Sequence, residues 1–83
     1  MPRPFTQQQQ YKTRTALILF IKGCATPLVL YFQRPEEVYA EIQGIIKTGA
    51  VKVLEKETIG PVKKFTILSS NIIAVALQEE QYV

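Results

Sequence analysis

Hydrophobic residues follow two different periods along the chain, and each period predicts a different element. From Thr15 to Lys22 both alternating sets of positions are apolar, which is typical of a central strand covered on two sides. Turn-forming residues interrupt this run from Gly23 to Pro27, and the apolar pattern resumes from Leu28 to Gln33. These two runs predict a hairpin with a connecting loop of about five residues.

The segment from Pro35 to Thr48 changes to the helical period. Proline favours the first turn of a helix, and the two glutamates that follow it are favourable near the positive end of the helix dipole. Gly49 suits the left-handed conformation that often ends a helix. The apolar residues of the segment fall within about 120° of arc on a helix, and they are Val38, Tyr39, Ile42, Ile45 and Ile46. We therefore predict one amphipathic helix over this segment.

Three more apolar runs predict strands after the helix: Val51–Glu57, Val62–Leu68 and Ile72–Gln78. Pro61 and the turn-forming residues Ser69–Asn71 separate them. The order β-β-α-β-β-β indicates an α+β fold, with one amphipathic helix packed on a mainly antiparallel sheet. Because one helix cannot cover both faces of five strands, the sheet either curls strongly on itself or shares its other face with another molecule.

The two ends of the chain lack this patterning. Residues 1–14 contain two prolines, the four consecutive glutamines Gln7–Gln10 and no hydrophobic period, so we predict a flexible arm. The remaining residues, 15–83, have the length of a single α+β domain. Beyond Gln78 we expect that domain to end in a charged, frayed segment.

The net charge of +3 belongs to the arm. No acidic residue accompanies Arg3, Lys12 and Arg14, whereas the other seven basic residues are balanced by seven glutamates. The arm is either an idle terminus or a segment that becomes ordered when these three side chains meet acidic or phosphate groups of a partner.

Several residue types are missing, and their absence excludes most enzyme chemistry. The chain has no His, Asp or Trp, so histidine bases, histidine metal ligands and aspartate nucleophiles cannot occur. Cys24 is the single cysteine, which fits a reducing cytoplasm, and we interpret it as an incidental loop residue. The longest apolar run, Ala16–Ile21, is too short for a membrane span or a signal peptide. We expect a cytoplasmic, non-enzymatic protein with no catalytic, cofactor-binding or metal-binding residue and no membrane association.

Two groups of residues are candidates for binding. If Val53 pairs with Ile67, then Lys52, Lys56 and Lys64 share one face of the sheet, where they could bind the phosphates of nucleic acid together with the arm. The alternative is a solvated face on which lysines prevent aggregation of the strands.

The second group lies on the outward side of the helix. Ala40, Gly44 and Thr48 form a stripe of small residues, and a glycine inside a helix costs about 1 kcal/mol relative to alanine. The stripe either contacts a partner helix or reflects tolerance of small residues at an exposed surface.

Short motifs spread from Pro27 to Glu79 resemble an uncharacterised family of small cyanobacterial proteins. The residues that carry the resemblance are Pro27-Leu28-Val29, Gln33-Arg34, Glu36-Glu37, Gly49, Leu54-Glu55, Lys63-Lys64, Ser70, Ile73-Ala74-Val75, Leu77 and Glu79. The resemblance implies a host group and a cytoplasmic location, and it brings no site residue with it. The glutamine-rich arm departs from the family pattern.

Elimination therefore favours a protein-interaction or regulatory module, which binds a protein partner through its uncovered sheet face or the outer surface of its helix. We expect it to be a monomer or a homodimer. The alternative is a weak nucleic-acid binder whose affinity falls as salt rises.

Overall fold

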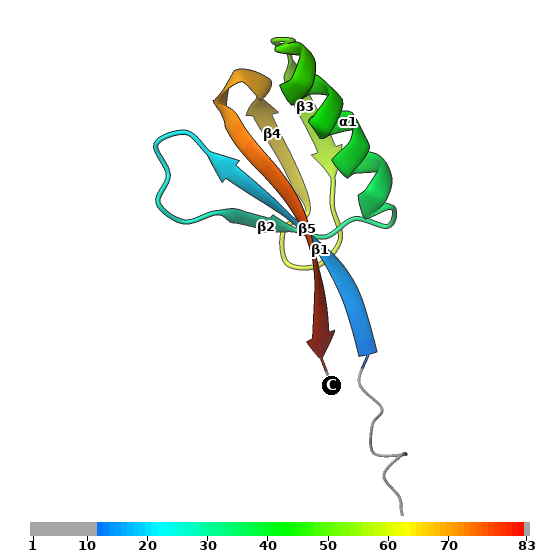
Figure 1. Ribbon diagram of the computed structural model, residues 1–83. Coiled ribbons are helices and arrows are strands. Elements are labelled where there is room, and N and C mark those ends of the chain that lie inside the picture. Colours follow the sequence, from blue (N-terminus) through cyan, green and yellow to red (C-terminus); the bar gives the residue numbers. More distant parts are fainter. Residues whose placement is uncertain (1–11, 83) are drawn as a thin grey trace, which may run out of the picture.

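The computed structural model describes residues 12–82 (Figure 1). Its elements are β1 (Lys12–Ile21), β2 (Leu28–Leu30), α1 (Pro35–Thr48), β3 (Val53–Glu57), β4 (Lys64–Leu68), the short 3-10 helix η1 (Ser69–Asn71) and β5 (Ile72–Tyr82). This order confirms the predicted α+β class with one helix and antiparallel strands.

The helix α1 has the bounds that its local signals predict. Pro35 lies in the first turn, and Gly49 ends the helix with a φ of 73°. The Gly49 N–H donates to the Ile45 carbonyl oxygen at 2.8 Å. Ile42 and Ile45 are buried, whereas Ile46 lies at the rim of the apolar face with 37% of its surface exposed.

Strand β1 is the central strand of a three-stranded antiparallel sheet, as its doubly apolar pattern predicts. Its neighbours are β2 and β5, in the order β2-β1-β5. Leu17 and Leu19 pair with Leu30 and Leu28 of β2 on one side. On the other side β5 pairs along the whole length of β1, with a bulge at Phe20/Ile21.

Strands β3 and β4 form a separate two-stranded sheet. An isolated bridge joins it to the end of β2, where the Ile59 N–H donates to the Tyr31 carbonyl oxygen at 2.8 Å. The five strands are therefore divided between two sheets. The β3–β4 hairpin and α1 together cover one face of the three-stranded sheet.

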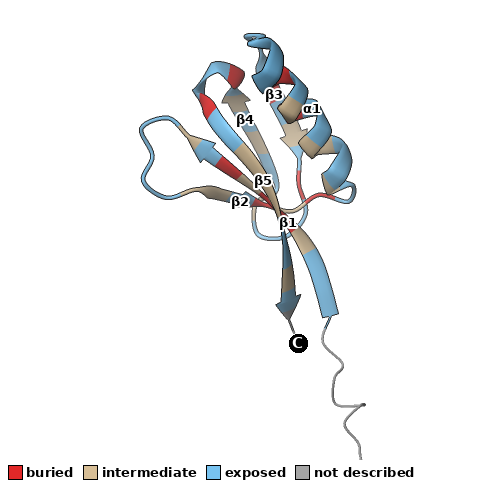
Figure 2. Ribbon diagram, in the orientation of Figure 1, coloured by how far each residue is buried: buried red, intermediate tan, exposed pale blue. Residues whose placement is uncertain are grey.

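One hydrophobic core joins the helix, the hairpin and one face of the three-stranded sheet, here called the core face (Figure 2). The rings of Phe32 and Phe65 meet edge to face, with their centroids 6.1 Å apart. The buried residues of the core are Leu17, Leu19, Leu30, Phe32, Ile42, Ile45, Leu54 and Ile72.

Strands β1 and β5 extend beyond the ends predicted for them. Lys12 to Arg14, which we assigned to the arm, belong to β1, and β5 continues past Gln78 to Tyr82 where we expected a frayed end. Lys12 pairs with Tyr82 and Arg14 with Glu80. These polar segments form strands because each provides the backbone of the other with hydrogen-bond partners. Such pairing does not require a hydrophobic pattern. Figure 1 shows them leaving the body as a two-stranded ribbon. The rest of the predicted arm, including Arg3, lies outside the described residues.

The register predicted for β3 and β4 is wrong by one residue. Val53 pairs with Leu68, and Ile67 pairs with Leu54. Because a shift of one residue exchanges the two faces of a strand, Leu54 enters the core and Val53 is 64% exposed. Backbone hydrogen bonding fixes this end of the hairpin, since the Ser69 N–H donates to the Lys52 carbonyl oxygen at 2.8 Å.

Candidate interaction surfaces

The observed register places Lys64 on the face of the hairpin opposite Leu54 and Lys56, although Lys56 and Lys64 both border a small hollow with Glu55 and Glu57. Lys56 follows Leu54 by two residues on β3, and its Nζ lies 2.6 Å from Oε1 of Glu41 on α1. Lys64 pairs with Glu57, and both lie on the face of the hairpin opposite Leu54. Lys52 precedes β3. The register on which the common lysine face was predicted is therefore wrong, and the nucleic-acid hypothesis itself stays a prediction.

The stripe of small residues on α1 is exposed as predicted. Ala40, Gly44 and Thr48 are all accessible, and a Cβ atom added at Gly44 would meet no heavy atom within 4 Å. The Thr48 hydroxyl donates to the Gly44 carbonyl oxygen at 2.9 Å, which is a bond within the helix. The docking role of this stripe stays a prediction.

Replacing Gly44 with alanine is expected to raise the free energy of unfolding by about 1 kcal/mol, because alanine restricts the unfolded chain and the added methyl group meets nothing. Chemical denaturation monitored by circular dichroism measures the change. The matched control is Ala40→Gly on the same side of α1, which should lower stability by a similar amount. A Gly44→Ala variant less stable than the original chain would contradict this account.

The three-stranded sheet presents a second apolar surface on the side opposite its core face. Because side chains alternate along a strand, Ile18 and Phe20 point away from the core that Leu17 and Leu19 enter. Ile18 pairs with both Val29 and Ala76, and Phe20 pairs with Ala74. We call the resulting surface the open face, and its residues are Ile18, Phe20, Val29, Ala74 and Ala76. Phe20 is 40% exposed and Val29 37% exposed, and no member of the open face is charged.

A polar cluster lies at the ribbon end of the same sheet. The Arg14 guanidinium carbon is 4.1 Å from the centroid of the Tyr31 ring, and Arg14 Nε is 3.1 Å from Glu80 Oε1. The Tyr31 hydroxyl donates to the same carboxylate oxygen at 2.9 Å. Burial and the hydrogen bond to Glu80 raise the pKa of Tyr31, so the phenol stays a neutral donor. This Tyr31 cluster joins β1, β5 and the segment after β2.

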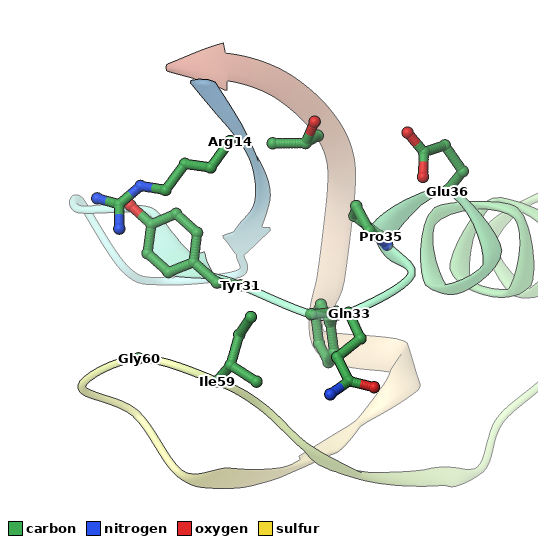
Figure 3. A pocket seen from close by; sticks show the side chains of 9 residues that line it. Arg14, Tyr31, Gln33, Pro35, Glu36, Ile59 and Gly60 are labelled. Carbon is green, nitrogen blue, oxygen red and sulfur yellow. The ribbon is translucent and has the colours of Figure 1, made fainter. Parts of the chain in front are cut away.

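A cleft opens beside the Tyr31 cluster, and we call it the edge cleft (Figure 3). Its volume is about 470 Å³. Strand β1, the segment after β2, the first turn of α1 and the loop after β3 all contribute to its walls. The lining residues are Arg14, Thr15, Tyr31, Phe32, Gln33, Pro35, Glu36, Ile59 and Gly60. Sequence reasoning missed this cleft because its residues come from four separate segments.

Neither surface carries a recognisable catalytic or metal-binding arrangement. Within residues 12–82, no group of three or more His, Cys, Asp or Glu side chains could hold a metal ion. Cys24 is exposed in the loop between β1 and β2. In the same part of the chain, no helix is long and apolar enough to cross a membrane.

Comparison of the chain with protein-family models, curated proteins and solved structures finds no match. We therefore infer the function from the surfaces themselves.

Proposed function

We propose that this protein is a non-enzymatic interaction module whose open face docks against an uncharged, apolar surface of a partner protein. The observation that carries the proposal is the apolar character of a sheet face that the helix and the β3–β4 hairpin leave uncovered. Both of those elements pack on the core face. Apolar surface is stabilised by removal from water, so a contiguous exposed patch favours association.

The chemistry of the open face supports an apolar partner. Its five side chains offer neither a charge nor a hydrogen-bonding group, so a charged partner surface would be desolvated there without compensation. The Tyr31 cluster borders the face with paired charges, as the polar rim of an interface does. A three-stranded face of this extent covers roughly 200 Å², well below the roughly 800 Å² per partner of a stable interface. We therefore expect a transient contact or one part of a larger one.

Photocrosslinking tests the proposal. A photoreactive phenylalanine analogue in place of Val29 should form a discrete adduct with one protein in an extract of the native host, and adding Phe20→Glu should abolish that adduct. Since Phe20 is 40% exposed, the glutamate is expected to cost less than about 1 kcal/mol of stability. The matched control carries the analogue in place of Val53, a valine on β3 that is 64% exposed and lies outside the open face, and it should not form that adduct.

Three results would contradict the proposal. The first is no adduct at position 29, and the second is an adduct that survives Phe20→Glu. The third is an adduct of twice the chain's mass, which would assign the open face to a second copy of the chain.

As part of the same proposal, we place the protein in the cytoplasm and among the small cyanobacterial proteins that it resembles. The exposed thiol of Cys24 is compatible with a reducing compartment, where it would stay unoxidised.

A further inference from the structure

Strand β1 is paired along only part of the edge that faces β2. On the side away from β5, β2 pairs with Leu17, Ile18 and Leu19 alone. Among residues 12–82, no strand pairs with β1 on that side before Leu17. In an antiparallel sheet, alternate residues direct their N–H and C=O groups to each side, so this edge can accept the backbone of another strand.

The edge cleft lies directly beside this part of β1. After Leu30 the chain leaves β1, and Tyr31 forms its bridge with Ile59 instead. Arg14 and Thr15 of β1 therefore line the cleft together with the segment after β2 and the Ile59 loop. Figure 3 shows the Arg14 side chain beside the Tyr31 ring at one end of the cleft. The volume of about 470 Å³ lies within the range of about 300–1,000 Å³ typical of ligand sites.

The side chains of the cleft match the two faces of an extended peptide. Phe32, Pro35 and Ile59 are apolar, whereas Thr15 and Gln33 are polar and can bind backbone or side-chain groups. Because side chains alternate along a strand, every second residue of a bound peptide would contact the apolar wall.

The charges around the cleft favour an uncharged ligand. Of the two charged side chains that line it, Arg14 already forms an ion pair with Glu80 and Glu36 is exposed to solvent in the first turn of α1, so neither attracts a charged ligand strongly. The Tyr31 cluster holds the Arg14 side chain against the Tyr31 ring and Glu80, which orders one wall before any ligand arrives. An ordered wall lowers the entropic cost of binding.

We propose that the edge cleft binds an extended, uncharged peptide segment of another protein, which adds as a strand to β1 and places alternate apolar side chains against Phe32 and Ile59. Strand addition of this kind takes its affinity from backbone hydrogen bonds and its specificity from alternate side-chain pockets. The proposal is independent of the open face, because none of the five open-face residues lines the cleft.

A random ten-residue peptide library displayed on phage, selected against the full chain, is the probe. Selected peptides are expected to be uncharged with apolar residues at alternate positions. A synthetic copy of the most enriched peptide should shift the amide resonances of Thr13–Ala16, Gln33 and Ile59 in a nitrogen-15 correlation spectrum. It should also show nuclear Overhauser contacts between its backbone and that of β1.

The decisive variant is Ile59→Glu, which brings a charge into the apolar wall and should weaken binding of that peptide at least tenfold. The matched control is Ile73→Glu, which should bind the peptide as the original chain does. Both side chains tolerate a charge in the fold, since Ile59 is 47% exposed and Ile73 64% exposed, and Ile73 does not line the cleft.

The inference fails if no peptide is enriched, if binding is unchanged by Ile59→Glu, or if the peptide shows no backbone contact with β1. Self-association of the chain that Ile59→Glu abolishes would assign the cleft to a second copy and overturn the peptide proposal. Resonance shifts confined to Ile18, Phe20 and Val29 would likewise overturn it, while supporting the open face. The Phe20→Glu experiment fails or succeeds separately from all of these.

Discussion

Truncation of Ile42 to alanine is expected to lower the free energy of unfolding by about 2–5 kcal/mol, the range for deletion of a large buried aliphatic side chain. Ile42 is completely buried and belongs to the core shared by α1, the hairpin and the core face. A domain of this length is stable by only about 4–12 kcal/mol. The Ile42→Ala variant should therefore be largely unfolded at elevated temperature, as measured by thermal and urea denaturation.

Ile46→Ala is the matched control because it removes the same atoms from the same helix one turn later. Ile46 is 37% exposed, so its truncation should cost about 1 kcal/mol or less. Equal losses in the two variants would mean that α1 is not seated on the sheet through Ile42, and the assignment of the open face would fail with it.

Replacement of Ser69 by alanine is expected to cost about 2 kcal/mol, although only one hydroxyl group is removed. The Ser69 Oγ accepts a hydrogen bond from the Lys52 N–H at 2.8 Å and donates one to the Ala50 carbonyl oxygen at 2.9 Å. Ser69 is 4% exposed, so the alanine variant leaves two backbone groups without their partner in a poorly hydrated place. Urea denaturation gives the loss of stability.

The neighbouring Ser70 provides the control for this variant. Ser70 is exposed, and Ser70→Ala should change stability by less than about 0.5 kcal/mol. A Ser69→Ala variant as stable as Ser70→Ala would show that the bonds of Ser69 do not hold the start of β3 against the end of β4.

The elements that local chemistry specifies could be predicted from the sequence. The helix α1 begins at a proline and ends before a left-handed glycine. Both signals lie within the helix or next to it, so they can be recognised without knowing the rest of the fold. The central place of β1 follows from the same kind of local information, because apolar residues at both alternating sets of positions are typical of a central strand. The pattern also predicted that both faces of β1 would be covered, whereas the elements of residues 12–82 cover the core face and leave the open face exposed.

The register of the hairpin could not be predicted in this way. Leu54 and Val53 are both apolar, so hydrophobicity alone does not decide which of them faces the core. The observed register is accompanied by hydrogen bonds of Ser69, which we interpreted only as a turn former. Its hydroxyl bonds to Lys52 and Ala50 link residues 17 and 19 positions apart in the chain.

The candidate surfaces depend on pairings between distant residues. Arg14 and Glu80 are 66 positions apart, and their contact is evident only once β1 and β5 are known to be neighbours. The open face was anticipated in general terms, since one helix cannot cover both faces of the strands. The edge cleft was not anticipated, because it exists where the chain after β2 diverges from β1.

The pairing of β1 with β5 also constrains when the native structure can form during synthesis. The register joins Lys12 to Tyr82, and β5 is the last strand of the described chain. A ribosome delivers the N-terminal segments first, so β1 waits without its longer neighbour until nearly all of these residues have emerged. Contacts of such high sequence separation slow folding. In the interval, the apolar residues of β1 would be exposed to chaperones.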